Sequence, residues 1–431
     1  MRCHDWLLLL ALLLPLGAAE AAEKPFDLVP AKLLQPRGGL GNVFAKLDAG
    51  QPVSIAYFGG SITAAGGWRP KTFAWFKQTW PNAKLTEINA AIGGTGSDLG
   101  VYRFKHDVLD HHPDLIFVEF AVNDGGAAPE NIWRSMEGIV RQTWQQDPAI
   151  DLCYVYTFVV GFAGDLGRGL CPRAASADEK LAEYYHIPAI NVALRTVELQ
   201  REGKLVYKTR ERNSDPVPPA TPGIIRFTDY DGVHPTDEGH NVYRDVIVKA
   251  LEELRPGSKP GRHELTAPFV ADNWVDAKMV PFQPAMFQGD WQQLPKDNQF
   301  VKSFGGRMYD LWQGSKPGST ITVKFKGTAI KFYDLLGPDA GQVLVTVDGQ
   351  QRPRPVARFD SYCSYHRLAT LVLAEGLPDG VHEVKIQIHP DQPDRTSVTK
   401  IEGPKPGFDP RKYDGTAIRV GAILLRGELL P

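Results

Sequence analysis

Two short segments of this sequence contain side chains suited to nucleophilic chemistry. Ser61 follows two glycines, and Asp231 and His234 lie three residues apart in the segment Asp-Gly-Val-His. A serine hydroxyl can attack a carbonyl carbon when an imidazole removes its proton and a carboxylate orients that imidazole. We therefore predict that Ser61 is a nucleophile, that His234 is its base and that Asp231 orients the base.

Two further segments supply candidate hydrogen-bond donors for the oxyanion that such an attack creates. Gly94 lies in a glycine-rich run where a main-chain N–H can approach a substrate closely, and Asn123 follows an apolar run and carries a side-chain amide. Each of these segments alone is also compatible with an ordinary turn, loop or helix cap. Their occurrence together in one chain predicts a site for acyl transfer.

The sequence from residue 53 to residue 254 alternates between apolar runs and amphipathic stretches. The runs predict strands at 53–58, 115–120, 152–160 and 187–192, and the stretches predict helices at 71–80, 101–111, 131–146, 174–185 and 237–254. Such alternation is typical of a three-layer α/β/α domain around a parallel sheet. Ser61 and Asn123 follow predicted strands, and active sites of such sheets lie beyond the carboxyl ends of the strands.

The pattern changes after residue 254. Residues 255–268 contain three prolines and two glycines, and beyond them apolar and polar residues alternate in short runs separated by turn residues. That pattern is typical of an all-β sandwich, here with a jelly-roll-like arrangement. For this chain of 431 residues we predict a catalytic domain at 23–254, a linker at 255–268 and a β-sandwich accessory domain at 269–431.

The first residues predict export. Arg2 and His4 precede an apolar run of eleven residues, which is followed by small residues up to Ala22. This is the pattern of a secretory signal peptide, here residues 1–22. The run is shorter than the about 20 residues that a membrane-spanning helix needs. We therefore expect a secreted or periplasmic protein that is not inserted in a membrane, with an uncleaved anchor as the alternative.

Composition narrows the range of partners. The chain has 48 basic and 50 acidic residues, so its near-neutral charge does not favour a nucleic acid as partner. Neither a Cys-x-x-Cys motif nor a His-rich cluster is present, and we expect no metal. Beyond the signal peptide, an oxidising compartment permits a Cys153 to Cys171 bridge, but three thiols including Cys363 cannot all pair, and buried free thiols are favoured.

Together, the four segments resemble the blocks of the SGNH, or GDSL-type, hydrolase family, over about residues 50–254. The blocks of that family contribute Ser, Gly, Asn and His, which match Ser61, Gly94, Asn123 and His234 in order, with Asp231 three residues before the His. The resemblance implies a flavodoxin-like α/β/α fold and ester hydrolysis through an acyl-enzyme, without a cofactor.

The resemblance also implies that the main-chain N–H of Ser61 is a third donor in the oxyanion hole. Two positions depart from the family pattern. Gly60 stands where the family usually has Asp, and Ala121 stands where it usually has Gly. Neither position belongs to the proton relay, so we expect these departures to affect the preference for the acyl group more than catalysis itself.

An exported esterase with a β-rich domain is similar to carbohydrate esterases that deacetylate polysaccharides. Trp68 and Tyr230 lie close in sequence to the candidate residues and are candidate rings for stacking on a sugar, although each is also compatible with core packing. We therefore expect an O-acetyl esterase acting on acetylated oligo- or polysaccharide. The alternatives are a catalytically inactive carbohydrate-binding protein and a lipase or thioesterase of the same fold. The irregular segment 204–228 is expected to form a wall of the cleft.

Overall fold

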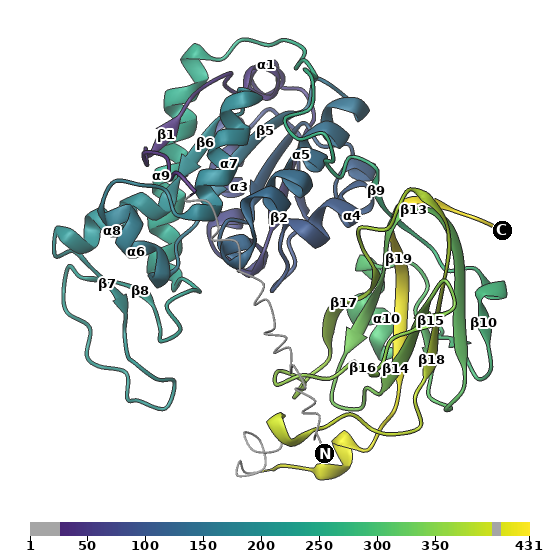
Figure 1. Ribbon diagram of the computed structural model, residues 1–431. Coiled ribbons are helices and arrows are strands. Elements are labelled where there is room, and N and C mark those ends of the chain that lie inside the picture. Colours follow the sequence, from purple (N-terminus) through teal and green to yellow (C-terminus); the bar gives the residue numbers. More distant parts are fainter. Residues whose placement is uncertain (1–25, 399–406) are drawn as a thin grey trace, which may run out of the picture.

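The computed structural model describes residues 26–398 and 407–431 (Figure 1). The predicted signal peptide, residues 1–22, lies outside the described residues. Within the described ranges, no helix combines the length and the apolar character that crossing a membrane requires.

The first domain is built on a six-stranded sheet. Its parallel strands are β2 (Val53–Gly59), β3 (Leu85–Asn89), β4 (Leu115–Glu119), β5 (Asp151–Tyr156) and β6 (Ala189–Asn191), and the short β1 (Leu34–Gln35) pairs antiparallel with β6. The parallel strands lie side by side as β3-β2-β4-β5-β6, which is the flavodoxin-like order. The direction of winding reverses between β2 and β4, and ligands of such sheets bind at this switch point.

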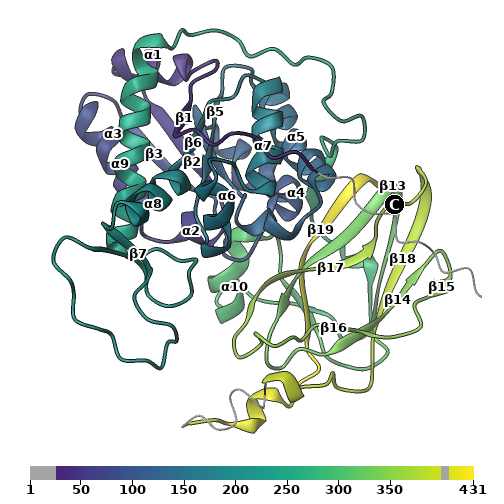
Figure 2. The same cartoon turned by 60° about the vertical axis from the view of Figure 1, so that its left-hand side comes forward.

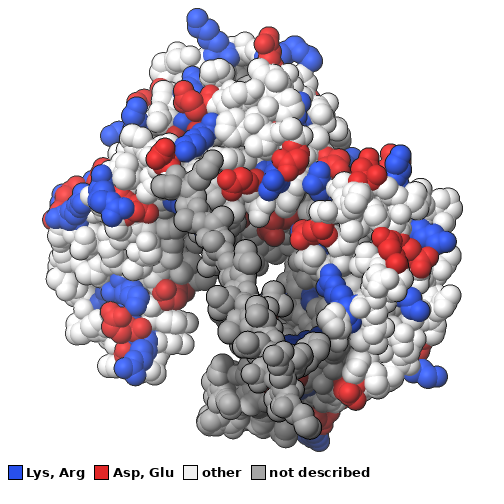
Figure 3. Space-filling view, in the orientation of Figure 1, with Lys and Arg blue, Asp and Glu red and all other residues white. Residues whose placement is uncertain are grey.

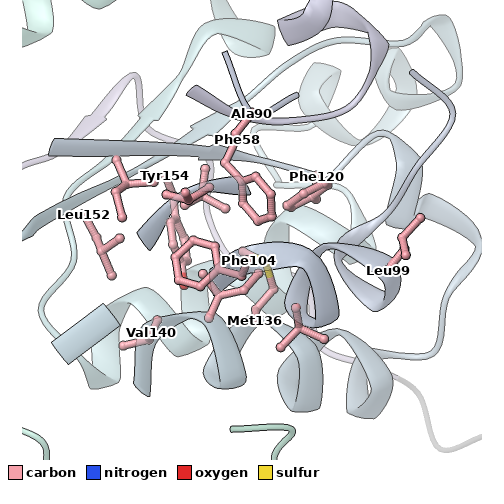
Figure 4. Close-up of a cluster of buried hydrophobic side chains, with 14 of the residues drawn as sticks. Phe58, Ala90, Leu99, Phe104, Phe120, Met136, Val140, Leu152 and Tyr154 are labelled. Carbon is pink, nitrogen blue, oxygen red and sulfur yellow. The ribbon is translucent and has the colours of Figure 1, made fainter. Parts of the chain in front are cut away.

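Helices cover both faces of the sheet (Figures 1 and 2). One face carries α1 (Gly41–Asp48), α3 (Trp68–Thr79), α8 (Val192–Arg201) and α9 (Asp237–Leu254), and the other carries α4 (Ser97–Asp107), α5 (Pro129–Gln146) and α7 (Arg173–Tyr184). In Figure 4, Phe58 of β2 lies over Phe104 and Met136 of the second group. Because both faces of the central strands are covered, their sequences are continuously apolar.

Every strand and helix predicted in this domain is present, although the strand at 152–160 is shorter than predicted, and β1, β3, α1 and α8 are among the elements that were not predicted. Predicted strand 152–160 ends at Tyr156, because the chain then leaves the sheet and the N–H of Phe158 donates to the Tyr243 hydroxyl at 2.7 Å. Strand β3 was not predicted. It lies at the edge of the sheet and is only half-buried, so its sequence Leu-Thr-Glu-Ile-Asn has no continuous apolar run.

Several short elements lie at the carboxyl ends of the parallel strands or beyond them. They are α2 (Ser61–Ala64), the 3₁₀ turn η2 (Asn123–Gly126), α6 (Ala163–Gly167) and the parallel pair β7 (Leu205–Lys208) and β8 (Ile225–Thr228). The long loop between β7 and β8 extends away from the domain (Figure 2). It corresponds to the irregular segment that the sequence predicted as a cleft wall.

The second domain contains an antiparallel sheet of eleven strands, folded around its own apolar core. The strands are β9 (Ala277–Val280), β10 (Phe287–Gln288), β11 (Gln292–Gln293), β12 (Trp312–Gly314), β13 (Thr320–Leu336), β14 (Gln342–Val347), β15 (Gln350–Gln351), β16 (Val356–Ala357), β17 (Arg367–Ala374), β18 (Gly380–Ile388) and β19 (Ile418–Leu429). The long β13 pairs with β18 along its first half and with β17 along its second half. The helix α10 (Gln299–Phe304) precedes β12.

The two domains pack directly against each other. Met279, Tyr333 and Leu424 of the β-domain belong to the same buried cluster as Val101 and Phe104 of α4. A shared apolar core of this kind resists relative motion of the domains, because separating them would expose it to water.

The segment predicted as a linker is fixed to the α/β domain along part of its length. The His263 ring stacks on Trp144 at 4.8 Å between centroids and lies 2.8 Å from the Asp151 carboxylate. Just beyond the segment, the Glu137 carboxylate accepts hydrogen bonds from the N–H groups of Phe269 and Val270. The boundary at 255–268 stays a prediction.

The three cysteines among the described residues are buried and unbridged. Cys153, Cys171 and Cys363 are free thiols. Of the two alternatives that the sequence left open, a Cys153–Cys171 bridge and buried free thiols, the structure has the second, which was favoured. Burial raises the pKa of the Cys363 thiol to about 11, so this thiol stays protonated and unreactive at neutral pH.

Candidate active site

The side chains of Ser61, His234 and Asp231 form one continuous hydrogen-bonded chain. Ser61 is the first residue of α2 and follows β2, whereas the other two lie in the loop between β8 and α9. Ser61 Oγ lies 2.8 Å from His234 Nε2, and His234 Nδ1 lies 2.7 Å from Asp231 Oδ2. At these distances the imidazole can take the proton of the serine hydroxyl while its other nitrogen stays bonded to the carboxylate.

The loop that holds Asp231 and His234 is fixed by its own backbone. The second oxygen of Asp231 accepts the N–H groups of Val233 at 2.8 Å and His234 at 3.0 Å. Gly232 between them has φ of +71°, and the side chain of Val160 would lie 2.8 Å from a Cβ added there. Only glycine adopts this turn without strain, so the sequence Asp-Gly-Val-His determines the spacing of the pair.

The Asp231 carboxyl is held in its charged form. Partial burial favours the neutral acid, but the hydrogen bonds from the Val233 N–H and from the ring and main chain of His234 outweigh it and lower the pKa of Asp231. A charged carboxylate next to Nδ1 keeps the proton on that nitrogen, which leaves Nε2 free to act as a base toward Ser61.

The candidate oxyanion donors come from the loops that follow β3 and β4. The loop after β3 is tied to β2, because the Ile92 N–H donates to the Gly59 carbonyl at 3.0 Å. It passes beside the candidate nucleophile, since a Cβ added at Gly93 would lie 3.5 Å from the Cβ of Ser61. Gly94 follows with φ of +73° and open space on the side where a Cβ would stand.

Asn123 lies against the turn that carries Ser61. A Cβ added at Gly60 would lie only 1.9 Å from Asn123 Oδ1. The space that a larger residue would occupy is therefore filled by the amide of Asn123. This explains in physical terms why glycine stands at position 60, where the family usually has Asp. The structure thus brings Ser61, the Gly94 loop and Asn123 together at the switch point of the sheet.

The candidate site is open to solvent. The side chains of His234 and Asp231 are 53% and 33% exposed. In Figure 2, α2 lies at the lower edge of the α/β domain, with α10 of the second domain beside it and the β7–β8 loop beyond it. On the face shown in Figure 3, acidic and basic residues are interspersed.

One of the two aromatic residues predicted to contact the substrate is buried instead. The Trp68 side chain is 0% exposed and packs edge-on against Tyr57 and Phe117. The prediction that it stacks on a sugar is wrong, because the start of α3 turns this ring into the core. Tyr230 is 36% exposed, with the Arg210 guanidinium 5.7 Å from its ring centroid, and its role stays a prediction.

A buried carboxyl group beneath the site was missed by the sequence analysis. Glu119 ends β4, and its two oxygens accept the hydroxyls of Thr63 and Thr157, each at 2.7 Å. Burial raises the pKa of Glu119 to about 7, although the hydrogen bonds from both threonines act to lower it. The one signal in the sequence is an acidic residue inside an otherwise apolar run, where a charged group is rarely left unpartnered.

The second domain also reaches the site, and no pattern in the sequence predicts this contact. Nη2 of Arg307, in the 3₁₀ turn η6 (Gly305–Arg307) after α10, lies 3.4 Å from the carbonyl oxygen of Ala91. Ala91 is three residues before Gly94 in the candidate oxyanion loop.

Comparison with known proteins supports this description of the fold. The chain is similar to two crystal structures of a two-domain esterase (CEX) active on acetylated mannans, one of them co-crystallized with mannopentaose. The identities are 21% and 20%, the TM-score is 0.68 in both cases, and the matches cover 92% and 91% of this chain and 97% of the other. At this level of identity the likeness establishes the two-domain fold.

Comparison of sequences identifies a relative that matches over part of its length and a family that matches the α/β domain. The chain is 33% identical over 82 residues to the uncharacterized lipoprotein YqeF of Bacillus subtilis (strain 168), over 18% of this chain and 34% of that protein. The chain thus spans about a third of the length of this relative. Residues 57–242, which include the whole candidate site, match the GDSL-like lipase/acylhydrolase family. The α/β domain of this chain is therefore similar to that lipase/acylhydrolase family, and the match supports a serine hydrolase acting on ester bonds.

Proposed function

We propose that this protein is an exported serine esterase that removes acetyl groups from carbohydrate through an acyl-enzyme on Ser61. The observation that carries the proposal is the unbroken chain of hydrogen bonds from Ser61 through His234 to Asp231 in a domain similar to an acylhydrolase family. In this proposal residues 1–22 direct export, residues 23–254 catalyse the reaction and residues 269–431 form the accessory domain.

The mechanism follows from the geometry of the three side chains. His234 Nε2 takes the proton of Ser61 as Oγ attacks the ester carbonyl, and Asp231 stabilises the imidazolium. The N–H groups of Ser61 and Gly94 and the amide of Asn123 are the donors proposed for the oxyanion. His234 then protonates the departing sugar hydroxyl, which leaves an acetyl group on Ser61. Water, activated by the same imidazole, attacks this ester and releases acetate.

Two observations support carbohydrate as the alcohol part of the ester. The imidazole is half-exposed, so a bulky polymer can approach it without an apolar lid having to open. The two-domain esterase whose fold this chain shares is active on acetylated mannans. Tyr230, exposed one residue before Asp231, remains the candidate ring for stacking on a sugar near the site.

Hydrolysis of a small aryl acetate by the Ser61→Ala variant tests the nucleophile. We expect turnover to fall by at least about 10⁴-fold relative to wild type, since loss of a nucleophilic serine leaves only residual catalysis. Ser361→Ala, an exposed serine of the second domain, is the matched control and should retain wild-type turnover. In the Asp231→Asn variant, we expect turnover of the aryl acetate to fall about 10⁴-fold, by analogy with the same substitution in another triad. Wild-type turnover in Ser61→Ala would reject the nucleophile, and wild-type turnover in Asp231→Asn would leave a dyad.

A second assay tests the substrate class. Wild-type protein is incubated with acetylated mannan, with acetylated xylan and with aryl esters of increasing acyl length, and released acid is measured. We expect acetate from at least one polysaccharide and falling rates with longer acyl chains. Hydrolysis confined to long-chain esters would instead identify a lipase, and binding of polysaccharide without hydrolysis of any ester would identify an inactive carbohydrate-binding protein.

A further inference from the structure

Three successive carbonyl groups in the loop before Gly94 each accept a hydrogen bond. The Ala90 carbonyl accepts from Arg103 at 2.6 Å, the Ala91 carbonyl from Arg307 at 3.4 Å, and the Ile92 carbonyl from the Thr95 hydroxyl at 2.8 Å. A carbonyl and the N–H of the next residue lie in one rigid plane. These bonds therefore orient three consecutive peptide planes, which determines how the chain enters Gly94.

One of these three donors comes from the other domain. Arg103 belongs to α4 and Thr95 to the loop itself, but Arg307 follows α10 of the β-domain. The position of Arg307 is well defined, because Met308 after it is buried and Phe304 before it packs on the core that the domains share. The guanidinium thus reaches the Ala91 carbonyl from a rigid support.

The surroundings of Arg307 explain why it bonds a carbonyl rather than a carboxylate. The Asp107 carboxylate acts on Arg307 electrostatically, but its two oxygens are already bonded to Arg103 and His106, each at 2.7 Å. Burial lowers the pKa of Arg307, an effect that Asp107 opposes and Arg103 strengthens. Arginine nevertheless keeps its charge at neutral pH. At 3.4 Å the contact between Arg307 and the Ala91 carbonyl is longer than a typical hydrogen bond, but the charge of the guanidinium strengthens its attraction to the carbonyl.

We propose that Arg307 is a positioning residue for ester hydrolysis, through which the β-domain holds the Gly94 N–H in place for the oxyanion. The accessory domain is then part of the catalytic machinery, rather than only a device for binding polymers. This inference rests on the proposed function, because it assigns a task to the same oxyanion loop.

The proposal predicts a particular kinetic pattern in the full-length protein. Arg307→Ala should lower kcat about tenfold, less than the about 10²- to 10³-fold that follows loss of a direct oxyanion donor. KM should change little, because the oxyanion forms only after the substrate has bound. The loss should be equal for an aryl acetate and for an acetylated polysaccharide, because both pass through the same tetrahedral intermediate. Arg307→Lys, which keeps the charge and a donor, should recover part of the rate.

The matched control is Arg352→Ala. Arg352 also donates to a backbone carbonyl, that of Leu373, but entirely within the β-domain. We expect Arg352→Ala to retain wild-type kcat, whatever its effect on the melting temperature. Inhibition by an aryl phosphonate, which forms a tetrahedral adduct on Ser61, gives an independent measurement. Its rate should fall in Arg307→Ala in proportion to kcat and stay unchanged in Arg352→Ala.

Each outcome decides between positioning and other roles. Wild-type kcat in Arg307→Ala would reject the proposal, as would a loss seen only with the polymer, which would indicate a substrate contact. An equal loss of kcat in Arg352→Ala would indicate general destabilisation and would also reject it. If the wild-type protein hydrolyses no ester at all, the proposed function fails first. If the wild-type protein is active and Arg307→Ala is unaffected, only the present inference fails.

Discussion

At the scale of single residues, the candidate site depends on glycines as much as on the reacting side chains. Gly232 allows the turn that joins Asp231 to His234, and Gly60 leaves the space that the amide of Asn123 fills. At both positions, contacts with neighbouring side chains explain why the residue is glycine. A substitution at either position should therefore change catalysis without touching any of the three hydrogen-bonded side chains.

Gly60→Ala tests this dependence directly. The added Cβ would lie 1.9 Å from Asn123 Oδ1, so the amide must move away from the place where we propose that it binds the oxyanion. We expect kcat for an aryl acetate to fall by about 10-fold to 10²-fold, approaching the effect of losing that donor. Gly66→Ala is the control, since a Cβ added there meets nothing within 4 Å. Wild-type kcat in Gly60→Ala would show that Asn123 is not a donor or can donate from elsewhere.

At the scale of elements, the Glu119 side chain ties the carboxyl ends of three strands together. It ends β4, binds Thr63 in α2 after β2, and binds Thr157 after β5. The carboxyl is buried, and its pKa of about 7 lies above the usual 4.5. Between these two values the unfolded chain gives up the proton that the folded chain keeps. The free energy of unfolding therefore falls as the pH rises through this window.

Glu119→Gln should remove this pH dependence, because the amide does not ionise. We expect the free energy of unfolding of Glu119→Gln, measured by urea denaturation, to increase relative to wild type as the pH rises from about 5 to about 7, and the difference to level off above that. Glu253→Gln, an exposed residue near the end of α9, should follow wild type throughout. A difference that is constant with pH would show that Glu119 does not titrate in this range.

At the scale of the whole molecule, the β-domain presents exposed aromatic rings on a fixed loop. Tyr362 and Tyr365 between β16 and β17 are 69% and 57% exposed. Cys363 between them is buried. The ring of His366, which follows Tyr365, lies edge-on to the ring of Phe300 in α10, with 4.7 Å between the ring centroids. Rings that are held in solvent by such a loop are suited to stacking on sugars. Because α10 also leads to Arg307, the loop lies on the part of the β-domain that faces the candidate site.

The double variant Tyr362→Ala/Tyr365→Ala should therefore bind polymer less well. We expect KM for an acetylated polysaccharide to rise about tenfold, because each ring contributes about 0.7 kcal/mol to the binding free energy. The kinetics on an aryl acetate should be unchanged. The corresponding Phe variants should behave as wild type because they keep the rings. Val381→Ala removes an equally exposed apolar side chain from β18 and should have no effect. An unchanged KM would show that these rings do not touch the polymer.

The elements that sequence patterns predict well are those whose burial is complete. The central strands are covered on both faces, so their sequences are apolar throughout, and α9 coincides with the predicted helix 237–254, with Thr236 capping it by accepting the Gly239 N–H. Where burial is partial, as in β3, the pattern weakens and the strand was missed. The bulge near Gly327 does not end the strand, so the residues on both sides of it form the single strand β13.

The sequence by itself determined the fold class and the candidate catalytic residues, because apolar periodicity and the four short segments are local properties of the chain. Only the tertiary structure decided which residues surround them. It buried Trp68, placed Glu119 beneath the nucleophile turn and brought Arg307 across from the second domain. Arg307 and Ala91 lie 216 residues apart in the chain. Contacts at such separation depend on how two domains pack, and no local pattern in the sequence records that packing.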